Sequence, residues 1–404
     1  MKRKFLYLVL TGLLVFGASS AIAQSKISGD VVKIGVLTDL SGLYSDLSGQ
    51  GSVIAAQMAV DEMGGKVAGK PVQVISADHQ NKADVGANKA REWYDREGVD
   101  MIVDVVNSGV ALAVTKVAAE KHKLFIDTGA GSTRLTNEDC NPYMIHWVYD
   151  TYATGTVTGK AVVQNGGKTW FFITADYAFG KSLQQDTTNA VQAAGGKVLG
   201  AVTHPLNASD FSSYLLQAQS SKAQVIGLAN AGGDTINSIK TANQFGITKS
   251  QKLAALLMFI TDVNALGLNT AQGMYVASSW YWDQNDNTRK FGKAFFNKTK
   301  KMPTMDQAGV YSAVLQYLKA IQKTGTDDAD AVVKQLKSTT MSDAFMTNGK
   351  IRADGRLIKD FYLFQVKSPG ESKYPWDYYK LLSTIPGDQA FQPLSLSRCP
   401  LIKK

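Results

Sequence analysis

Two short turns rich in serine and glycine carry the residue types that suit an anion. Asn107-Ser108-Gly109 follows the apolar stretch 101–106, and Gly129-Ala130-Gly131-Ser132 follows the apolar stretch 124–128. Glycine lets a ligand approach the backbone, while serine hydroxyls and the unpaired N–H groups at a helix start donate hydrogen bonds to negative groups. We interpret the two turns as a grip for a carboxylate. The alternative is that serine and glycine are simply common in turns between strands and helices.

The segments around these turns predict that the turns meet. Residues 101–106 and 124–128 are short runs rich in branched apolar residues, typical of strands buried on both faces, and residues 110–121 between them have helical spacing. A helix between two strands makes the strands parallel, so both turns lie at the same carboxyl edge of a sheet. Ligands of open α/β sheets bind at that edge.

The alternation of strands and helices runs twice along the chain, and residues 143–152 interrupt it. Strands are predicted at 33–38, 71–77, 101–106, 124–128, 169–174, 197–202, 224–229, 253–260, 274–278, 361–366 and 377–382. Helices are predicted at 51–63, 83–98, 110–121, 181–194, 234–245, 288–300, 306–324 and 328–337, with another beginning near residue 211. A chain of 404 residues is too long for one core, so the pattern predicts two α/β lobes.

The first 23 residues have the pattern of a secretory signal peptide. Lys2, Arg3 and Lys4 give a charged start, residues 5–16 are apolar, and Ala21-Ile22-Ala23 is a small-residue cleavage pattern. Residue 24 is glutamine, so a lipid-anchored cysteine is not expected there. We therefore expect an exported protein.

The charged residues and short motifs argue against two other classes of protein. Without the three basic residues of the signal, the formal net charge falls from +9 to +6, and the remaining basic residues are scattered, which argues against nucleic-acid binding. The dehydrogenase fingerprint, the P-loop, the G-x-S-x-G elbow and the H-E-x-x-H motif are all missing from the sequence. The four histidines are isolated. We expect no enzyme, no metal and no cofactor.

The two cysteines, Cys140 and Cys399, are far apart in the chain. In an oxidising compartment a pair of cysteines is expected to form a disulfide, which would tie the tail back to the first lobe. Two free, buried thiols are the alternative.

Four segments together resemble one known family. They are VKIGVLTDLSGLYSDLSGQGSVIAAQMAVDEMGG at 32–65, VVNSGVALAV at 105–114, FIDTGAGSTRLT at 125–136 and FFITADYAFGKSL at 171–183. They resemble the periplasmic solute-binding proteins of ABC importers, of the branched-chain amino acid (leucine-binding) type. The resemblance covers essentially the whole mature chain.

The resemblance implies a type I periplasmic binding protein, an α/β fold with two doubly wound parallel-sheet lobes joined by three hinge crossings. The lobes would close on a small-molecule ligand and present it to the membrane permease of an ABC importer. Crossings are expected near 148–151, 278–280 and 360–364. The expected N-terminal lobe is 24–148 plus 279–362, and the expected C-terminal lobe is 149–278 plus 363–404. A monomer is expected.

The chain departs from the amino-acid binders of that family at one point. Those proteins place an acidic side chain of the second lobe against the ligand ammonium, whereas the matching stretch here, LAALLMFITD at 253–262, is apolar around that position. Asp234 and Asp262 are nearby alternatives. The variants YMIHWVYDTYATGT and ITADYAFG look like those of the branch that takes up aromatic carboxylates.

We therefore expect a small aromatic acid, of the benzoate or hydroxycinnamate type, stacked on aromatic side chains. The predicted ligand-binding residues are Tyr44, Asn107, Ser108, Gly109, Ala130, Gly131, Ser132, Tyr149, Asp150, Tyr177, Phe179, Asn230, Gly232, Trp280 and Trp282. Three readings stay open beside this one: an aromatic belt that only supports the hinge, a binder of branched-chain or other hydrophobic amino acids, and a ligand sensor for a membrane receptor.

Overall fold

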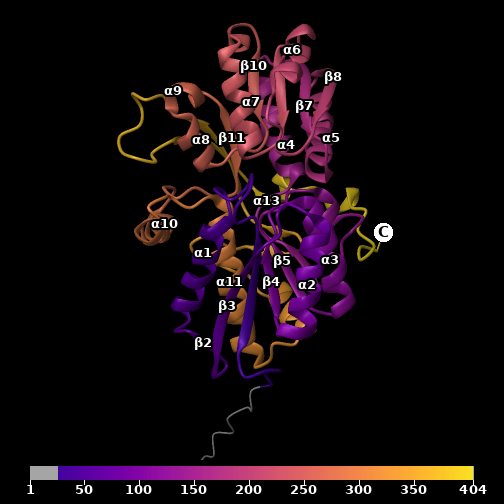
Figure 1. Cartoon of the computed structure of the whole chain (residues 1–404), viewed down its shortest axis with the longest axis vertical. Helices are drawn as coiled ribbons and strands as arrows, with labels where there is room; N and C mark the ends of the chain where they lie inside the picture. Colours follow the sequence, from indigo (N-terminus) through magenta and orange to yellow (C-terminus); the bar gives the residue numbers. More distant parts are fainter. Residues whose placement is uncertain (1–25, 404) are drawn as a thin grey trace, which may run out of the picture.

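The computed structural model describes residues 26–403, in two lobes stacked along the long axis of the molecule (Figure 1). The expected signal peptide, residues 1–23, lies outside the described residues. In that described part, no helix is both long and apolar enough to cross a bilayer. The fold is the expected α/β type, with a parallel sheet in each lobe.

The first lobe is built on a six-stranded sheet in the order β2-β3-β1-β4-β5-β6. Its strands are β1 (Val32–Thr38), β2 (Lys66–Val67), β3 (Lys70–Asp78), β4 (Met101–Asp104), β5 (Leu124–Asp127) and β6 (Met144–His146). Only β2 is antiparallel, because it forms a tight hairpin with β3. β4 and β5 are buried along their whole length, as expected for parallel strands covered on both faces.

The helices of the first lobe come from both ends of the chain. They are α1 (Gly49–Glu62), α2 (Ala83–Glu92), α3 (Ser108–Lys121), α10 (Asp286–Thr299), α11 (Met305–Thr324) and α12 (Ala329–Ser338), with a π turn at Trp93–Glu97 and a 3-10 turn at Thr133–Thr136. The long, almost fully buried α11 packs against α1 and β4. Figure 1 shows this orange helix beside the indigo α1, so the late helices complete the first lobe.

The second lobe has a four-stranded parallel sheet in the order β10-β9-β7-β8. Its strands are β7 (Thr169–Ala175), β8 (Lys197–His204), β9 (Val225–Ala229) and β10 (Lys252–Ala255). Its helices are α4 (Thr151–Gln164), α5 (Ala178–Ala193), α6 (Ser212–Ser220), α7 (Gly233–Gln244), α8 (Ile260–Leu266) and α9 (Leu268–Ala271), with a 3-10 turn at Ile247–Lys249.

Three passages of the chain join the lobes: one between β6 and α4, one after β11 (Tyr275–Ser278), and one before β14 (Phe361–Val366). β11, β14 and β15 (Tyr379–Ile385) form a separate antiparallel sheet. The remaining elements are the β12 (Lys350–Ile351) and β13 (Leu357–Ile358) hairpin, α13 (Gly387–Ala390) and a 3-10 turn at Leu394–Leu396. The resemblance implied crossings near 148–151, 278–280 and 360–364, and these positions and the lobe boundaries stay a prediction.

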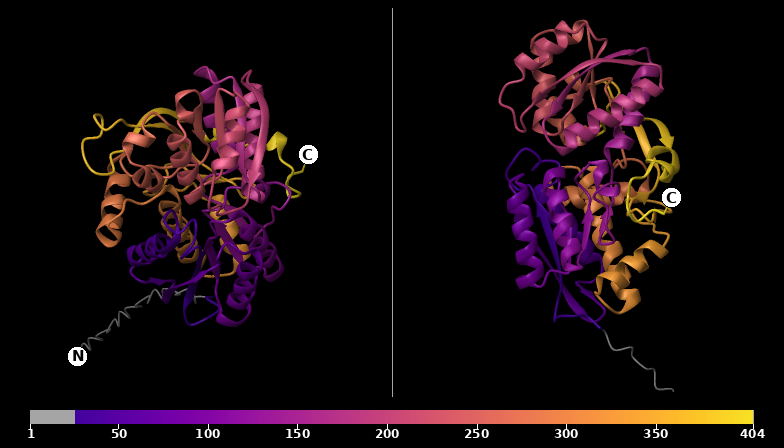
Figure 2. Two further views of the ribbon diagram at one scale, coloured as in Figure 1. Left: turned by 45° about the horizontal axis from the view of Figure 1, so that its top comes forward. Right: turned by 90° about the vertical axis from the view of Figure 1, so that its right-hand side faces the viewer.

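The expected disulfide is confirmed. Cys140 is bonded to Cys399, with their Cα atoms 5.6 Å apart. The bond fastens the C-terminal tail to the loop before β6, and Figure 2 shows the yellow tail lying beside the boundary between the lobes.

The expected strand at 253–260 is wrong in its second half. β10 ends at Ala255, and the next four residues leave the sheet before α8 begins at Ile260. These four residues are nevertheless buried, at 1–2% exposure. An apolar run satisfies burial in a strand or in a loop, so apolarity alone did not locate the strand end.

Candidate functional site

A narrow cavity with an empty volume of about 200 Å³ lies between the lobes. Its lining residues are Tyr44, Leu47, Val106 and Tyr149 from the first lobe and first crossing, and Tyr177, Phe179, Ala231, Leu257 and Phe259 from the second lobe. The lining is apolar or aromatic throughout. The space left at its centre is about 10 Å³, enough for about one water molecule, so a ligand enters only when these side chains or the lobes move apart.

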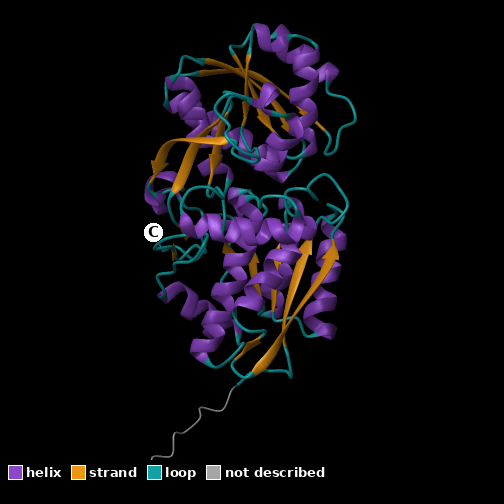
Figure 3. Ribbon diagram, turned by 90° about the vertical axis from the view of Figure 1, so that its left-hand side faces the viewer, coloured by secondary structure: helices purple, strands orange, loops and turns teal. Residues whose placement is uncertain are grey.

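The strands explain why these side chains meet. Each lining residue follows the carboxyl end of a parallel strand, and in Figure 3 the arrowheads of the first-lobe strands point toward the second lobe. At the end of β4, Asp104 and Val105 have φ angles of 83° and 60°. A left-handed conformation is costly for a β-branched residue and is held only where the surroundings enforce it. This bend directly precedes the lining residue Val106.

The two serine turns meet beside this cavity. The backbone N–H of Ser132 donates to the Ser108 hydroxyl at 3.1 Å. An added Cβ on Gly131 would lie 2.8 Å from the Tyr149 ring and 3.0 Å from the Phe179 ring. Gly131 therefore sits directly against the aromatic wall, where a side chain would intrude.

The donors of the first turn are only partly available to a ligand. The Asn107 side-chain oxygen accepts from the N–H groups of Gly109 and Val110 at 2.9 and 3.2 Å, so Asn107 caps α3. This differs from the expectation that the helix start is free for an anion. Within residues 26–403, the N–H groups of Ser108 and Gly131 have no protein acceptor and stay available.

Buried acidic groups contact the second turn. The Ala130 N–H donates to the Asp127 carboxyl at 3.2 Å, and Asp104 Oδ1 lies 2.8 Å from where a Gly129 Cβ would be. Burial raises the pKa of Asp104 to about 6 and raises the pKa values of Asp127 and Asp306 well above the usual range. Burial thus shifts Asp127 and Asp306 strongly toward their neutral forms, which weakens their repulsion of a ligand carboxylate, while Asp104 stays mostly ionised at pH 7.

Two of the three tyrosines that line the cavity, Tyr44 and Tyr177, approach each other from opposite lobes. The hydroxyl oxygens of Tyr44 and Tyr177 are 2.6 Å apart, and Tyr177 is the N-cap residue directly before α5. Gly232, with a φ of 58°, lies against Tyr44: an added Cβ would be 2.9 Å from the Leu43 carbonyl oxygen and 3.1 Å from the Tyr44 ring. Burial raises the pKa of both tyrosines, so both hydroxyls stay protonated.

Two predicted site residues support the fold instead of lining the cavity. The Asp150 carboxylate accepts from the Ala153 N–H at 2.8 Å, capping α4, and lies 3.8 Å from the Arg356 guanidinium. The Asn230 amide joins His204 and Ser238 at 3.1 and 3.2 Å inside the second lobe. Both side chains are occupied by these contacts.

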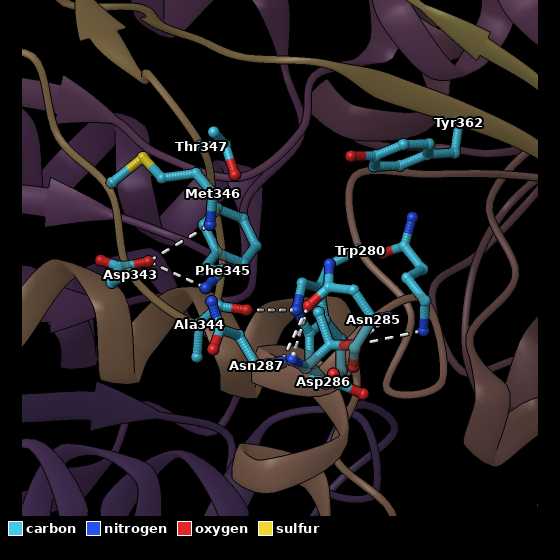
Figure 4. Close-up of a pocket in the computed structure, with 12 residues that line it drawn as sticks. Trp280, Asn285, Asp286, Asn287, Asp343, Ala344, Phe345, Met346, Thr347 and Tyr362 are labelled. Carbon is cyan, nitrogen blue, oxygen red and sulfur yellow. Dashed lines mark hydrogen bonds between the residues drawn. The ribbon is translucent and has the colours of Figure 1, made fainter.

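Trp280 and Trp282 lie outside the cavity. The Trp280 indole N–H donates to the Ala344 carbonyl at 2.8 Å, and the Trp282 indole N–H donates to the Trp376 carbonyl at 3.0 Å. Trp280 instead lines a larger pocket, with about 810 Å³ of empty volume, between the start of α10 and residues 343–347 (Figure 4). After β11 the chain turns toward α10, which carries both indoles away from the inter-lobe cavity.

The larger pocket offers fewer free polar groups than its size suggests. Asp343, one of the two acidic residues that line it, accepts from the side chains of Ser312 and Gln316 and from the N–H groups of Phe345 and Met346. Figure 4 shows the last two bonds within the loop that forms the wall. We therefore take the inter-lobe cavity as the candidate ligand site.

The cavity is also lined by residues that no sequence pattern singled out. Leu47, Val106, Ala231, Leu257 and Phe259 line it, yet as apolar residues they do not stand out from the core. Phe259 was hidden in the stretch assigned to a strand. Only its position after β10 in the folded protein reveals its role.

The lining includes no charged side chain, as far as the described residues go. Asp262 is fully buried, accepts from the Phe259 N–H at 2.8 Å, and has its pKa raised by burial to about 7. Asp234 accepts from the Asn207 N–H at 3.0 Å, and burial raises its pKa to about 6. Neither acid lines the cavity, so a ligand ammonium would lack a direct counter-charge.

Comparison with known proteins shows which family the chain resembles in sequence and structure. The family model described as periplasmic binding protein matches residues 31–372. A periplasmic binding protein from Burkholderia mallei is 58% identical, with a TM-score of 0.91 over 93% of this chain and 100% of that one. A branched chain amino acid ABC transporter periplasmic ligand-binding protein from Burkholderia xenovorans is 44% identical, with a TM-score of 0.82 over 92% and 99%.

A more distant solved structure shares the fold. It is the solute binding protein of an ABC transporter from Rhodopseudomonas palustris in complex with 3,4-dihydroxybenzoic acid, 20% identical, with a TM-score of 0.79 over 89% of this chain and 98% of that one. The family is one of solute-binding proteins and not of enzymes. The chain belongs to the periplasmic binding protein family and is a solute-binding protein of ABC transport.

Proposed function

We propose that this protein captures a small aromatic carboxylate, of the benzoate or hydroxycinnamate type, between its lobes and delivers it as a monomer to the membrane permease of an ABC importer. One observation carries the ligand class. Among the described residues, the cavity has aromatic walls and no charged lining residue, and the hydrogen-bond donors of two turns meet next to its Tyr149 and Phe179 rings. Such a site suits a flat apolar body with one negative group.

The proposed pose places the ligand carboxylate at Ser108 and Gly131. The Ser108 hydroxyl and the N–H groups of Ser108 and Gly131 would donate to it, helped by the positive end of α3. The ring would lie among Tyr149, Phe179 and Phe259, where Tyr149 and Phe259 already form an edge-to-face pair with centroids 6.1 Å apart. Contacts to residues of both lobes would favour the closed arrangement.

A hydrophobic amino acid is the second candidate, because the 44% identical structure is named for branched-chain amino acid transport. The apolar walls would accept a leucine side chain. Its ammonium, however, would contact neither Asp234 nor Asp262, because neither lines the cavity, although Asp234 Oδ1 has no hydrogen-bond partner among the described residues. The absence of a counter-charge therefore favours the aromatic acid.

Calorimetry on the mature protein tests whether it binds aromatic acids or hydrophobic amino acids. The panel is benzoate, 4-hydroxybenzoate, cinnamate, 4-hydroxycinnamate, leucine, isoleucine and valine, with benzamide as the neutral match of benzoate. We expect at least one aromatic acid to bind with micromolar or better affinity, and benzamide to bind at least about tenfold more weakly than benzoate because it lacks the charge. Binding of leucine together with no binding of any aromatic acid would reverse the proposal.

A further inference from the structure

The end of the cavity opposite Gly131 is lined by two hydroxyl groups. Gly131 lies against the Phe179 ring. The Tyr177 ring is next along the wall, with its centroid 6.0 Å from that of Phe179. The Tyr177 hydroxyl is hydrogen-bonded to the Tyr44 hydroxyl. Gly232 closes the far side against Tyr44. The wall thus runs from the carboxylate-binding turn to a pair of tyrosine hydroxyls, one from each lobe.

This pair has unused hydrogen-bonding capacity. Within the described residues, the only hydrogen-bond partner of each hydroxyl is the other, at 2.6 Å. A hydroxyl group has one hydrogen and two acceptor positions, so the pair retains one free hydrogen and several acceptor positions. Tyr44 is only 2% exposed, whereas Tyr177 is partly exposed, so the unmet capacity shielded from water is that of Tyr44. Buried polar capacity without a partner is costly, and a ligand group that satisfies it gains binding energy.

The charge near the two tyrosine hydroxyls determines which ligand group can bind there. The buried Asp234 carboxyl lies close enough to both tyrosines to raise their pKa values further. Burial holds its own pKa near 6, so at neutral pH it is mostly ionised. A second carboxylate on the ligand would be repelled there, whereas a neutral hydroxyl can both donate and accept.

We infer that Tyr44 and Tyr177 recognise a hydroxyl group on the ligand ring, at the end away from the carboxylate, so that ring-hydroxylated aromatic acids are the preferred class. This inference rests on the proposed function and narrows it. The ligand hydroxyl inserts between or beside the two tyrosine hydroxyls and links the lobes through one hydrogen-bonded chain. It therefore acts on closure as well as on affinity.

The test compares ligands matched in size. Calorimetry of the wild-type mature protein with 4-hydroxybenzoate and 4-methylbenzoate, and with 4-hydroxycinnamate and 4-methylcinnamate, gives a hydroxyl-to-methyl affinity ratio. We expect a ratio of about ten or more in at least one pair, the size of one buried hydrogen bond left unmet. Ratios near one for both pairs, with the acids still binding, overturn the inference and leave the proposed function standing. No binding by any aromatic acid overturns both.

Two variants locate the effect. The double variant Tyr44→Phe/Tyr177→Phe should bring the ratio close to one, because both hydroxyls are removed while the rings remain. The matched control Tyr378→Phe removes a hydroxyl that donates to Asn264 at 2.8 Å outside the cavity, and it should keep the wild-type ratio. If the double variant folds and keeps the wild-type ratio, other residues cause the preference for a ring hydroxyl, and the inference is overturned. Should the double variant not fold, Tyr177→Phe alone is measured, with a reduced ratio expected.

Discussion

The hydroxyl of Thr133 in the first lobe donates to the carboxyl group of Asp186 on α5 at 3.2 Å. Thr151 donates to the same group at 2.7 Å, and Ser132 and Ser182 meet nearby at 2.8 Å between their hydroxyl oxygens. These bonds hold α5 against the turn at 129–132, which is proposed to bind the ligand carboxylate. They belong to the closed arrangement, because Thr133 and Asp186 lie in different lobes.

Asp186 therefore predicts a pH dependence of ligand binding. Burial in the closed arrangement raises its pKa to about 6, while opening would expose the group and return it toward its usual value near 3.9. A raised pKa means that the closed form binds more protons, so acidification through pH 6 favours closure. We expect affinity for the aromatic acid to rise about tenfold from pH 8 to pH 5.

The variant Asp186→Asn should flatten that dependence, since an amide does not titrate. The measurement is calorimetry at pH 5, 6, 7 and 8, a range in which the ligand stays mostly ionised. The fully exposed Asp30 provides the control, because Asp30→Asn should leave the slope unchanged. Equal slopes in wild type and Asp186→Asn would show that another group, such as Asp234, is responsible.

If the two turns bind the ligand carboxylate, loss of a serine hydroxyl should weaken binding of a charged ligand more than binding of its neutral analogue. Replacing Ser108 with alanine should weaken benzoate binding about tenfold, because a hydrogen bond to a charged group is worth roughly 1.5–3 kcal/mol. Binding of neutral benzamide should change much less. The exposed Ser220 of α6, which donates to the Leu216 carbonyl at 2.8 Å, gives the matched control Ser220→Ala. Equal losses for acid and amide would remove the carboxylate role.

The sequence predicted the sheets well and the site less well, for physical reasons. Parallel strands buried on both faces are unbroken apolar runs, so β4, β5 and β9 stand out, and the turns after β4 and β5 could be placed at one edge. Asn107 was expected to face a ligand because it is polar at a helix start. The same position is the usual place of a capping residue, and only coordinates show where its amide points.

Aromatic residues show the same limit. Tyr44, Tyr177 and Phe179 line the cavity, while Trp280 and Trp282 pack elsewhere with their N–H groups bonded to carbonyls. Large rings serve packing and ligand binding alike, so residue type does not separate the two roles. Position after the end of a parallel strand does: each of the three lining rings follows such an end, and the two indoles follow an antiparallel strand.

The disulfide predicts a large contribution to stability. Cys140 and Cys399 are 259 residues apart, and the tail is also held by Asn137, which donates to Gln392 at 2.7 Å and accepts from the Arg398 N–H at 2.9 Å. Closing so long a loop restricts the unfolded chain, and removing native disulfides typically costs about 2–5 kcal/mol. The double variant Cys140→Ser/Cys399→Ser should lower the free energy of unfolding by that amount in urea titrations. A thiol assay on the denatured wild type should detect no free thiol; two would contradict the bond.

Lys359 predicts a rise in stability with pH. Its ammonium is buried, donates to the carbonyls of Ser279 and Asp360 at the second and third crossings, and lies 4.5 Å from the centre of the Phe345 ring. Burial lowers its pKa to about 7 from 10.5. The unfolded chain therefore binds more protons between these two values, so the free energy of unfolding should increase as pH rises from 7 toward 9.5.

The variant Lys359→Met keeps much of the side-chain volume but does not titrate, so its free energy of unfolding should rise less over the same pH range. Urea titrations at pH 7, 8, 9 and 9.5 measure both slopes, and Lys240→Met on the exposed side of α7 serves as the control with the wild-type slope. Parallel curves for wild type and Lys359→Met would mean that the buried amine keeps its charge up to pH 9.5. In that case its bonds to the two crossing carbonyls, and not its titration, would define its role at the hinge.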